Sequence, residues 1–193
     1  MMHVRLATSQ DHDIIRKLTR KAFFDVYRPG CSEHLIVDKL RLDAIYVPQL
    51  EYVLERHGNI IAHIIYAVAS IKHRDGSLID TLIFGPISVN PLYQKQGYGS
   101  ALIIHTLRVA KNLGYKFIAI TGNPSYYQRF GFLPALQYDV NYGDMDKSTD
   151  QSFFMIKILD ESFKDDIVGT FIEPTIYHVD DTELAAYESK YKW

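Results

Sequence analysis

The sequence has little of several residue types that mark specialised classes of protein. Its 193 residues include one cysteine, Cys31, so no internal disulfide can form, and a reducing, cytoplasmic setting is expected. Neither sign of charge is in excess, because 21 basic and 23 acidic residues give a net charge of −2 with neutral histidines. Nucleic-acid-binding proteins usually carry a clear basic excess, so nucleic acid is not the expected partner.

Long hydrophobic runs are also missing. The longest, residues 60–71, is interrupted by His63 and Ser70 and is too short to cross a bilayer. The N-terminal residues include Arg5 and soon turn polar, without the apolar stretch of a signal peptide. No membrane partner is therefore expected. Hydrophobic residues still make up 47% of the chain, which is the globular average, so a single domain over residues 1–193 is predicted.

The hydrophobic pattern alternates between the strand and helix periods. Residues 97–113 give the clearest helix, followed by Gly114 where a left-handed glycine belongs. Asp75-Gly76 indicates a hairpin, so antiparallel pairs are expected and the order predicts an α/β fold with a mixed sheet. The expected strands are 2–7, 50–56, 60–71, 78–89, 116–121, 132–136, 153–159 and 169–178, the expected helices are 11–24, 32–42, 97–113, 125–130 and 180–190, and 138–152 is expected to be a polar loop.

The strand expected at 78–89 contains Gly85-Pro86 in its middle. Proline cannot donate a hydrogen bond to a neighbouring strand, so an interior proline requires a bulge or the edge of a sheet. This strand then ends at Pro91, and a tight loop with Gly97 and Gly99 leads directly into the long helix. The first amides of a helix lack acceptors and lie at the positive end of its dipole. The segment therefore predicts an anion site suited to a pyrophosphate, although the two glycines also fit a plain tight turn.

Two nucleotide-binding motifs do not fit this loop. A Walker A loop requires a glycine–lysine pair, and the loop has none. The dinucleotide-binding fingerprint requires a third glycine, but Leu102 stands at that position. The loop does match the pattern Q/R-x-x-G-x-G/A, which Gln94-Lys95-Gln96-Gly97-Tyr98-Gly99 fills.

With this motif after a hydrophobic strand, the sequence resembles the GNAT superfamily of acetyl-CoA-dependent N-acyltransferases. A second block, Tyr126-Tyr127-Gln128-Arg129-Phe130-Gly131-Phe132, resembles the tyrosine-x-x-x-glycine-phenylalanine element of that family. Gly85-Pro86 and residues 122–127 resemble its YhbS-like subgroup. The resemblance covers about residues 3–136 in element order, and residues 137–193 are expected to form an extension of strands and a helix.

The resemblance implies a bulged, splayed central strand whose freed backbone groups pair with the pantetheine arm of coenzyme A as an added strand. The alternative is that Gly85-Pro86 only marks an edge strand. Acetyl-CoA is the implied cosubstrate, without a metal, since the eight histidines show no metal-ligand spacing. The implied cofactor-binding residues are Ile87, Ser88, Val89, Gln94, Lys95, Gln96, Gly97, Tyr98, Gly99, Ser100 and Asn123.

The family match gives Tyr127 the role of the acid that protonates the departing thiolate, with Tyr126 as the adjacent alternative. A tyrosine pKa of roughly 10 suits a thiol pKa of roughly 8.5. Many family members carry a glutamate base on the strand before the loop, but Leu82 to Gly85 occupy those places here. Asp80 is the nearest carboxylate and Glu33 a weaker candidate, and a water relay or a weakly basic amine are alternatives.

The expected reaction is direct transfer of an acetyl group from acetyl-CoA to a primary amine of a small molecule or a protein. The competing interpretation is a non-catalytic sensor that binds coenzyme A. The missing glutamate favours the sensor, whereas Tyr127 favours the enzyme. Homodimerisation is possible on this sequence, and the acceptor cannot be identified from it.

Overall fold

The computed structural model describes residues 2–164 and 166–193, which form two compact units. Unit 1 contains the described residues up to 66, together with 85–106 and 175–193. Unit 2 contains 67–84 and the described residues between 107 and 174. Strands β3 (Asn59–Lys72) and β4 (Leu78–Val89) and helix α3 (Tyr98–Asn112) contribute to both units. The prediction of a single domain over residues 1–193 stays a prediction.

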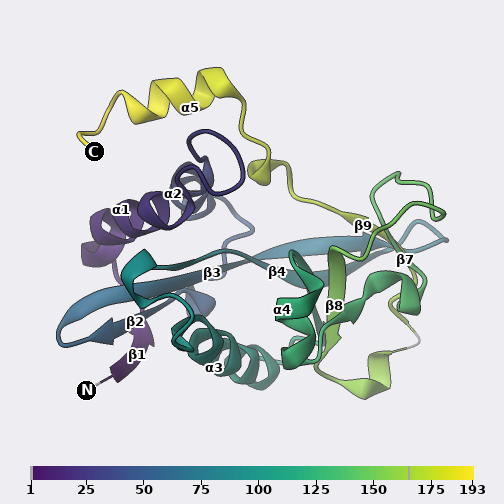
Figure 1. Cartoon of the computed structure of the whole chain (residues 1–193). Coiled ribbons are helices and arrows are strands. Elements are labelled where there is room, and N and C mark those ends of the chain that lie inside the picture. The colour runs from purple at the N-terminus through teal and green to yellow at the C-terminus, as the bar shows by residue number, and fades with distance from the viewer. Residues whose placement is uncertain (1, 165) are drawn as a thin grey trace. The chain divides into compact units, whose positions relative to one another are not determined.

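In unit 1, an antiparallel group of strands carries helices on both faces. β1 (Met2–Leu6) pairs with β2 (Tyr52–Arg56), which pairs with the first part of β3. Helices α1 (His12–Phe23) and α2 (Glu33–Leu40) lie on one face of these strands and α3 begins on the other (Figure 1). The buried faces of α1 and α2 supply Ile15, Leu18, Leu35, Val37 and Leu40 to the core.

A 3₁₀ turn over Ser9–Asp11 leads into helix α1 and is closed by a capping box between Thr8 and Asp11. The carboxylate of Asp11 accepts hydrogen bonds from the backbone amide and the hydroxyl of Thr8, each at 2.8 Å. It also forms an ion pair with Arg5 at 2.7 Å. A carboxylate at a helix start stabilises the unpaired amides there. These contacts hold the pKa of Asp11 well below its usual range.

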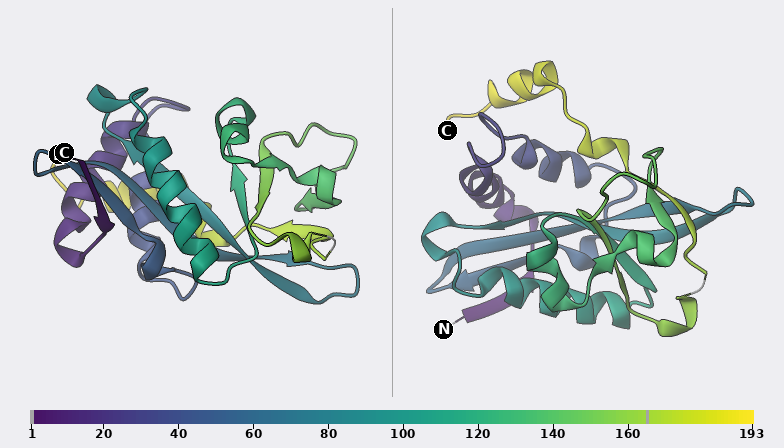
Figure 2. Two further views of the ribbon diagram at one scale, coloured as in Figure 1. Left: turned by 90° about the horizontal axis from the view of Figure 1, so that it is seen from below. Right: turned by 45° about the vertical axis from the view of Figure 1, so that its right-hand side comes forward.

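The C-terminal segment packs on α1 and α2, in both views of Figure 2. Helix α5 (Asp181–Glu188) contributes Tyr187, whose hydroxyl donates to the Asp38 carboxylate at 2.5 Å. Arg16 of α1 binds the same carboxylate oxygen at 2.6 Å. Trp193 lies beyond the end of α5, and its ring centroid is 4.7 Å from the guanidinium of Arg20 in α1. The segment after residue 175 therefore covers its own unit through charged and aromatic contacts.

Unit 2 contains both parallel and antiparallel pairs, which confirms the predicted mixed sheet. β4 pairs with β5 (Phe117–Thr121) in parallel, and β5 pairs with β8 (Phe154–Ile158) antiparallel. β8 also pairs with β6 (Leu133–Pro134). The register of the β4–β5 pair ends at Ile83 and Ala119, although each strand continues beyond it. The pairing of β4 with β5 is therefore short, as expected for a strand that is splayed from its parallel neighbour.

The structure corrects two expectations for residues after 137. The stretch 138–152, expected to be a polar loop, contains strand β7 (Val140–Tyr142), which pairs in parallel with β9 (Gly169–Ile172). Gln151 supports β7 by accepting from the Tyr142 amide at 2.8 Å. The strand expected at 169–178 ends at Ile172, because Pro174 removes a backbone donor and a 3₁₀ turn follows. The first difference arises from pairing between segments distant in the chain, which a local pattern does not contain, whereas the second has the local cause of Pro174.

Within the part of the chain that the structure describes, none of the helices combines the length and apolar character needed to cross a membrane.

Candidate functional site

The loop between β4 and α3 is held in shape by its own amide side chains. Asn90 accepts a hydrogen bond from the Leu92 amide at 3.2 Å and starts a 3₁₀ turn over Pro91–Tyr93. The side chain of Gln94 donates to the Val89 carbonyl at 3.1 Å. Gln96 donates to the Leu92 carbonyl at 3.2 Å. The two glutamine side chains therefore brace the loop, so the predicted cofactor contacts of this segment fall to its backbone amides.

The backbone after Gln94 turns sharply before α3 begins. Lys95 and Gly97 adopt left-handed conformations, with φ of +59° and +86°. An added Cβ on Gly97 would meet no atom within 4 Å, so the space in front of this residue is open. The Ala101 amide donates to the Gly97 carbonyl at 2.9 Å and closes the turn that leads into the helix. The amides before Ala101 lie at the positive end of the helix. This end is suited to an anion such as a pyrophosphate.

The last residues of β4 alternate between buried and half-buried side chains. Ser88 is buried, and its hydroxyl lies 2.9 Å from the Thr19 hydroxyl. Its side chain is thus committed to the core, and only its backbone is suited to pair with a ligand. Ile87 and Val89 are half-buried, and Gly99 and Ser100 form the first turn of α3 with Tyr98. The structure brings the predicted loop and strand residues of unit 1 together.

Tyr127 lies in unit 2, at the end of the short helix α4 (Pro124–Tyr127). Its side chain is buried, with ring centroids 5.9 Å from both Phe84 and Phe132. Tyr126 is half-buried, and the guanidinium of Arg129 lies over its ring at 5.0 Å. The two tyrosines therefore have different environments, and Tyr127 has the more firmly held ring.

The start of α4 explains part of the second sequence block. The Asn123 side chain accepts from the Ser125 amide at 3.0 Å and caps the helix. Pro124 follows in the first helical position, where its missing N–H costs nothing. Asn123 therefore has a local structural role, and its contact with the cofactor stays a prediction.

The two carboxylates considered as bases lie in different surroundings. Asp80 is exposed on β4. Burial raises the pKa of Tyr115, which follows the end of α3, and the charge of Asp80 raises it further. Glu33 is half-buried at the start of α2, where its carboxylate accepts from the Ser32 amide at 3.0 Å. Neither contact identifies a base, so both assignments stay predictions. Among the described residues, no group of three or more histidine, cysteine, aspartate or glutamate side chains is placed to hold a metal ion.

The buried thiol of Cys31 lies beside a histidine. Its sulfur is 3.5 Å from Nδ1 of His34, and Nε2 of His34 is 3.3 Å from a carboxylate oxygen of Glu188 without hydrogen-bond geometry. This order resembles a nucleophile, a base and an orienting acid. However, Cys31 is 1% exposed and burial raises the pKa of its thiol to about 12. The burial of Cys31 and its raised pKa argue against a nucleophilic role for this thiol.

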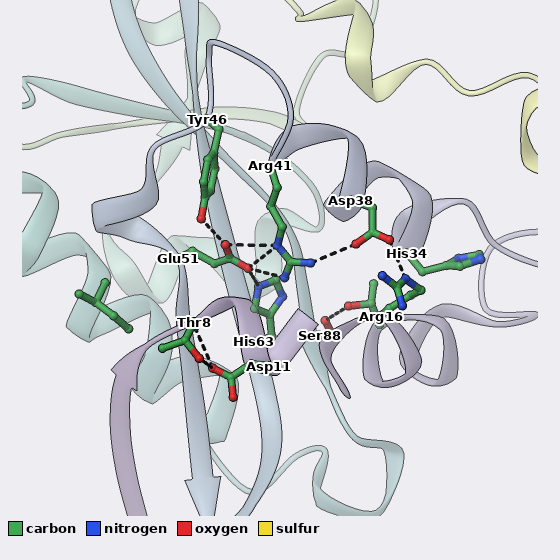
Figure 3. A network of polar contacts seen from close by, with 12 residues as sticks. Thr8, Asp11, Arg16, His34, Asp38, Arg41, Tyr46, Glu51, His63 and Ser88 are labelled. Atoms are coloured by element: carbon green, nitrogen blue, oxygen red, sulfur yellow. Dashed lines mark hydrogen bonds and ion pairs between the residues drawn. The ribbon is translucent and has the colours of Figure 1, made fainter. Parts of the chain in front are cut away.

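A second polar cluster lies in the interior of unit 1 (Figure 3). The Glu51 side chain is 1% exposed and binds Arg41 at 2.5 Å and Nε2 of His63 at 2.9 Å. The Tyr46 hydroxyl also donates to this carboxylate. Although burial opposes the charge, these donors hold the pKa of Glu51 well below its usual range. Because its charges compensate one another internally, the cluster is suited to fixing the α2–β2 connection.

A further signal in the sequence is a long segment without acidic residues. No aspartate or glutamate occurs from 81 to 138, a stretch that contains both motif blocks. It contains the basic residues Lys95, Arg108, Lys111, Lys116 and Arg129. A segment of one charge sign inside a slightly acidic chain is what an anionic ligand favours. The net charge of the whole chain does not reveal this segment, because acidic residues elsewhere in the sequence offset its positive charges.

Comparison with known proteins agrees with this arrangement. The sequence profile described as an acetyltransferase (GNAT) domain matches residues 3–135. None of the curated proteins matches the chain. The chain is similar in fold to the GNAT family N-acetyltransferase YhbS from Escherichia coli in complex with CoA, with a TM-score of 0.78, 22% identity and coverage of 91% of each chain. A GNAT family acetyltransferase from Brucella melitensis in complex with acetyl-CoA has a TM-score of 0.72 and 26% identity, over 92% of this chain and 99% of that one.

Proposed function

The chain belongs to the GNAT acetyltransferase family, and on that basis we propose that it transfers an acetyl group from acetyl-CoA to a primary amine. The observation that carries the proposal is the loop at residues 94–97, whose left-handed turn presents the start of α3 to open space. The relative from Brucella melitensis, crystallised with acetyl-CoA, supports the choice of donor.

The residues of unit 1 supply the binding step. The amides from Gly97 to Ser100 would hold the pyrophosphate, because they lie at the positive end of a 15-residue helix. The backbone of Ile87 to Val89 would pair with the pantetheine arm, since β5 does not pair with that part of β4. When bound, acetyl-CoA supplies a thioester, whose carbonyl carbon is open to attack by an amine.

The proposed chemistry forms one bond and breaks another. The amine nitrogen forms a bond to the carbonyl carbon, the carbon–sulfur bond breaks, and the thiolate receives a proton. The Tyr127 hydroxyl is the proposed donor of that proton, because packing fixes its ring. The ordinary pKa of a tyrosine, roughly 10, is also close to that of a thiol, roughly 8.5. The amine loses a proton to water or to a carboxylate, with Asp80 as the proposed candidate. Possible acceptors are small amines and the amines of a protein.

A non-catalytic coenzyme A sensor remains the second candidate. It is favoured by the apolar residues Leu82, Ile83 and Phe84, which stand where many family members place a glutamate. Steady-state release of free thiol from acetyl-CoA with a panel of amines separates the two candidates. Amine-dependent release with a mass increase of one acetyl group on the acceptor supports the enzyme. Tight coenzyme A binding without turnover for any amine supports the sensor.

A further inference from the structure

Arg56 lies at the end of β2, in a corner formed by two tyrosine rings of the loop. Its guanidinium carbon is 5.4 Å from the centroid of the Tyr93 ring and 5.8 Å from that of Tyr98. The two rings are 6.1 Å apart and nearly perpendicular. Tyr93 ends the 3₁₀ turn before the loop and Tyr98 begins α3. Arg56 therefore touches both ends of the segment at residues 94–97.

The guanidinium has no other partner in the described part of the chain. None of the described residues accepts a hydrogen bond or an ion pair from Arg56. The adjacent carboxylate, Glu55, is bound by Arg5 at 2.6 Å instead. Because neighbouring side chains of a strand point to opposite faces, Glu55 is turned away from the loop. Contacts with aromatic rings consume no N–H group, so the donors of Arg56 are unsatisfied by the protein.

Residues 91–101, which include the loop and the first turn of α3, carry one charge, and it is positive. Lys95 is exposed in the loop, and the first turn of α3 carries no acidic residue at its positive end. An arginine beside the positive end of a helix is unfavourable in the absence of an anion. The aromatic contacts hold the cation there despite the repulsion.

We propose that Arg56 is a phosphate-binding residue of the cofactor site, held in position by Tyr93 and Tyr98. The inference rests on the proposed function, because that function provides the nucleotide. The planar guanidinium can donate two parallel hydrogen bonds to one phosphate group. Arg56 would thus add a charged side-chain contact to the neutral backbone amides at the start of α3. Coenzyme A offers two sources of phosphate, the pyrophosphate and the 3′-phosphate of the ribose.

Calorimetric titration of Arg56→Gln with coenzyme A and with dephospho-CoA, which lacks the 3′-phosphate, tests this proposal. The variant should bind coenzyme A about tenfold more weakly than the unchanged protein, the loss typical of a charged hydrogen bond. The matched control is Arg108→Gln, which removes the same charge from an exposed position ten residues after Tyr98 on the same helix. Arg56→Lys keeps the charge but loses the planar donors, and it should recover only part of the affinity.

The outcomes separate the alternatives. Weaker binding of both ligands by Arg56→Gln assigns Arg56 to the pyrophosphate, and weaker binding of coenzyme A alone assigns it to the 3′-phosphate. Equal affinities of Arg56→Gln and the unchanged protein overturn the proposal, as does an equal loss in Arg108→Gln, which would indicate a general field. If the unchanged protein binds no coenzyme A, the proposed function itself fails. Circular dichroism of each variant verifies that it is folded.

Discussion

Gly122 leaves the space that the Tyr127 ring occupies. A Cβ added to Gly122 would lie 2.5 Å from Cε2 of Tyr127 and 3.2 Å from its Cδ2. The ring has little room to retreat, since Phe84 and Phe132 contact it. The glycine before α4 is thus required by the side chain five residues later, and the pair places the proposed acid.

Gly122→Ala should therefore destabilise the protein by about 1–3 kcal/mol, the usual cost of overpacking a filled site. The same change made together with Tyr127→Leu should cost less, because the smaller side chain vacates the position of Cε2. Chemical denaturation of the four proteins in this cycle measures the difference. Strictly additive costs would show that the two residues do not meet.

Tyr127→Phe tests the proposed acid while keeping the ring and its packing. Loss of the hydroxyl should lower kcat by on the order of 10²-fold with little change in acetyl-CoA affinity, because the contact is made in the transition state. Tyr126→Phe is the matched control and should be much milder. A large loss in Tyr126→Phe instead would move the role by one residue. Near-full turnover in both variants would exclude a tyrosine acid.

The left-handed conformation at Gly97 allows a separation of binding from stability. Gly97→Ala places a side chain at φ +86°, and Gly76→Ala does the same at φ +90° in the β3–β4 turn. Each change should cost about 1–2 kcal/mol of stability through backbone strain. Only Gly97→Ala should also weaken acetyl-CoA binding by calorimetry, because only that loop faces the ligand. Equal affinities of the two variants would contradict the role of the loop.

Removing the charge of Glu51 should be far more damaging than removing a surface charge. Glu51→Gln removes the buried carboxylate that binds the Arg41 side chain, which is 5% exposed, and leaves it with Asp38 as its remaining carboxylate partner. Removing one member of a buried ion pair typically costs about 3–5 kcal/mol in the free energy of unfolding, and the contact with Asp38 places this change toward the lower end. Asp13→Asn, which breaks the exposed ion pairs with Arg16 at 3.0 Å and Lys17 at 2.8 Å, should cost far less. Urea unfolding compares the two, and similar losses would contradict the structural role of the cluster.

Stability should fall as the pH drops from about 6.5 toward 4. Burial lowers the pKa of His34 to about 4. Between about pH 6.5 and 4, His34 is therefore protonated in the unfolded chain but stays neutral in the folded chain. The contribution is therefore complete above the ordinary pKa and is lost as pH falls, by at most about 1.4 kcal/mol per pH unit. Burial also lowers the pKa of His63, so His34→Gln should reduce the slope without removing it. An unchanged slope in His34→Gln would refute this assignment.

Local signals carried most of what the sequence predicted. The loop before α3 could be placed because Asn90, Gly97 and Gly99 each act on neighbouring backbone. The mixed sheet followed from the hairpin at Asp75-Gly76, whose turn separates β3 from β4 as expected. The GNAT resemblance then extended these local signals to a family, which the match over residues 3–135 confirms.

Contacts between distant segments could not be predicted in the same way. Arg56 meets Tyr93 and Tyr98 only because β2 and the start of α3 come together in the folded chain. Similarly, β7 exists as a strand because β9 pairs with it, while its own residues resemble a loop. The acid-free segment at 81–138 was visible in the sequence, but its meaning depends on which cations it gathers.

The docking of the C-terminal segment has a spectroscopic consequence. Trp193 is the only tryptophan of the chain, and its ring centroid lies 5.0 Å from that of His34 and beside the guanidinium of Arg20. Indole emission excited above the tyrosine band therefore reports on the surroundings of this one residue. Undocking of α5 would transfer the indole to water and shift its emission to the red, so the fluorescence of the unlabelled protein follows this segment separately from global unfolding.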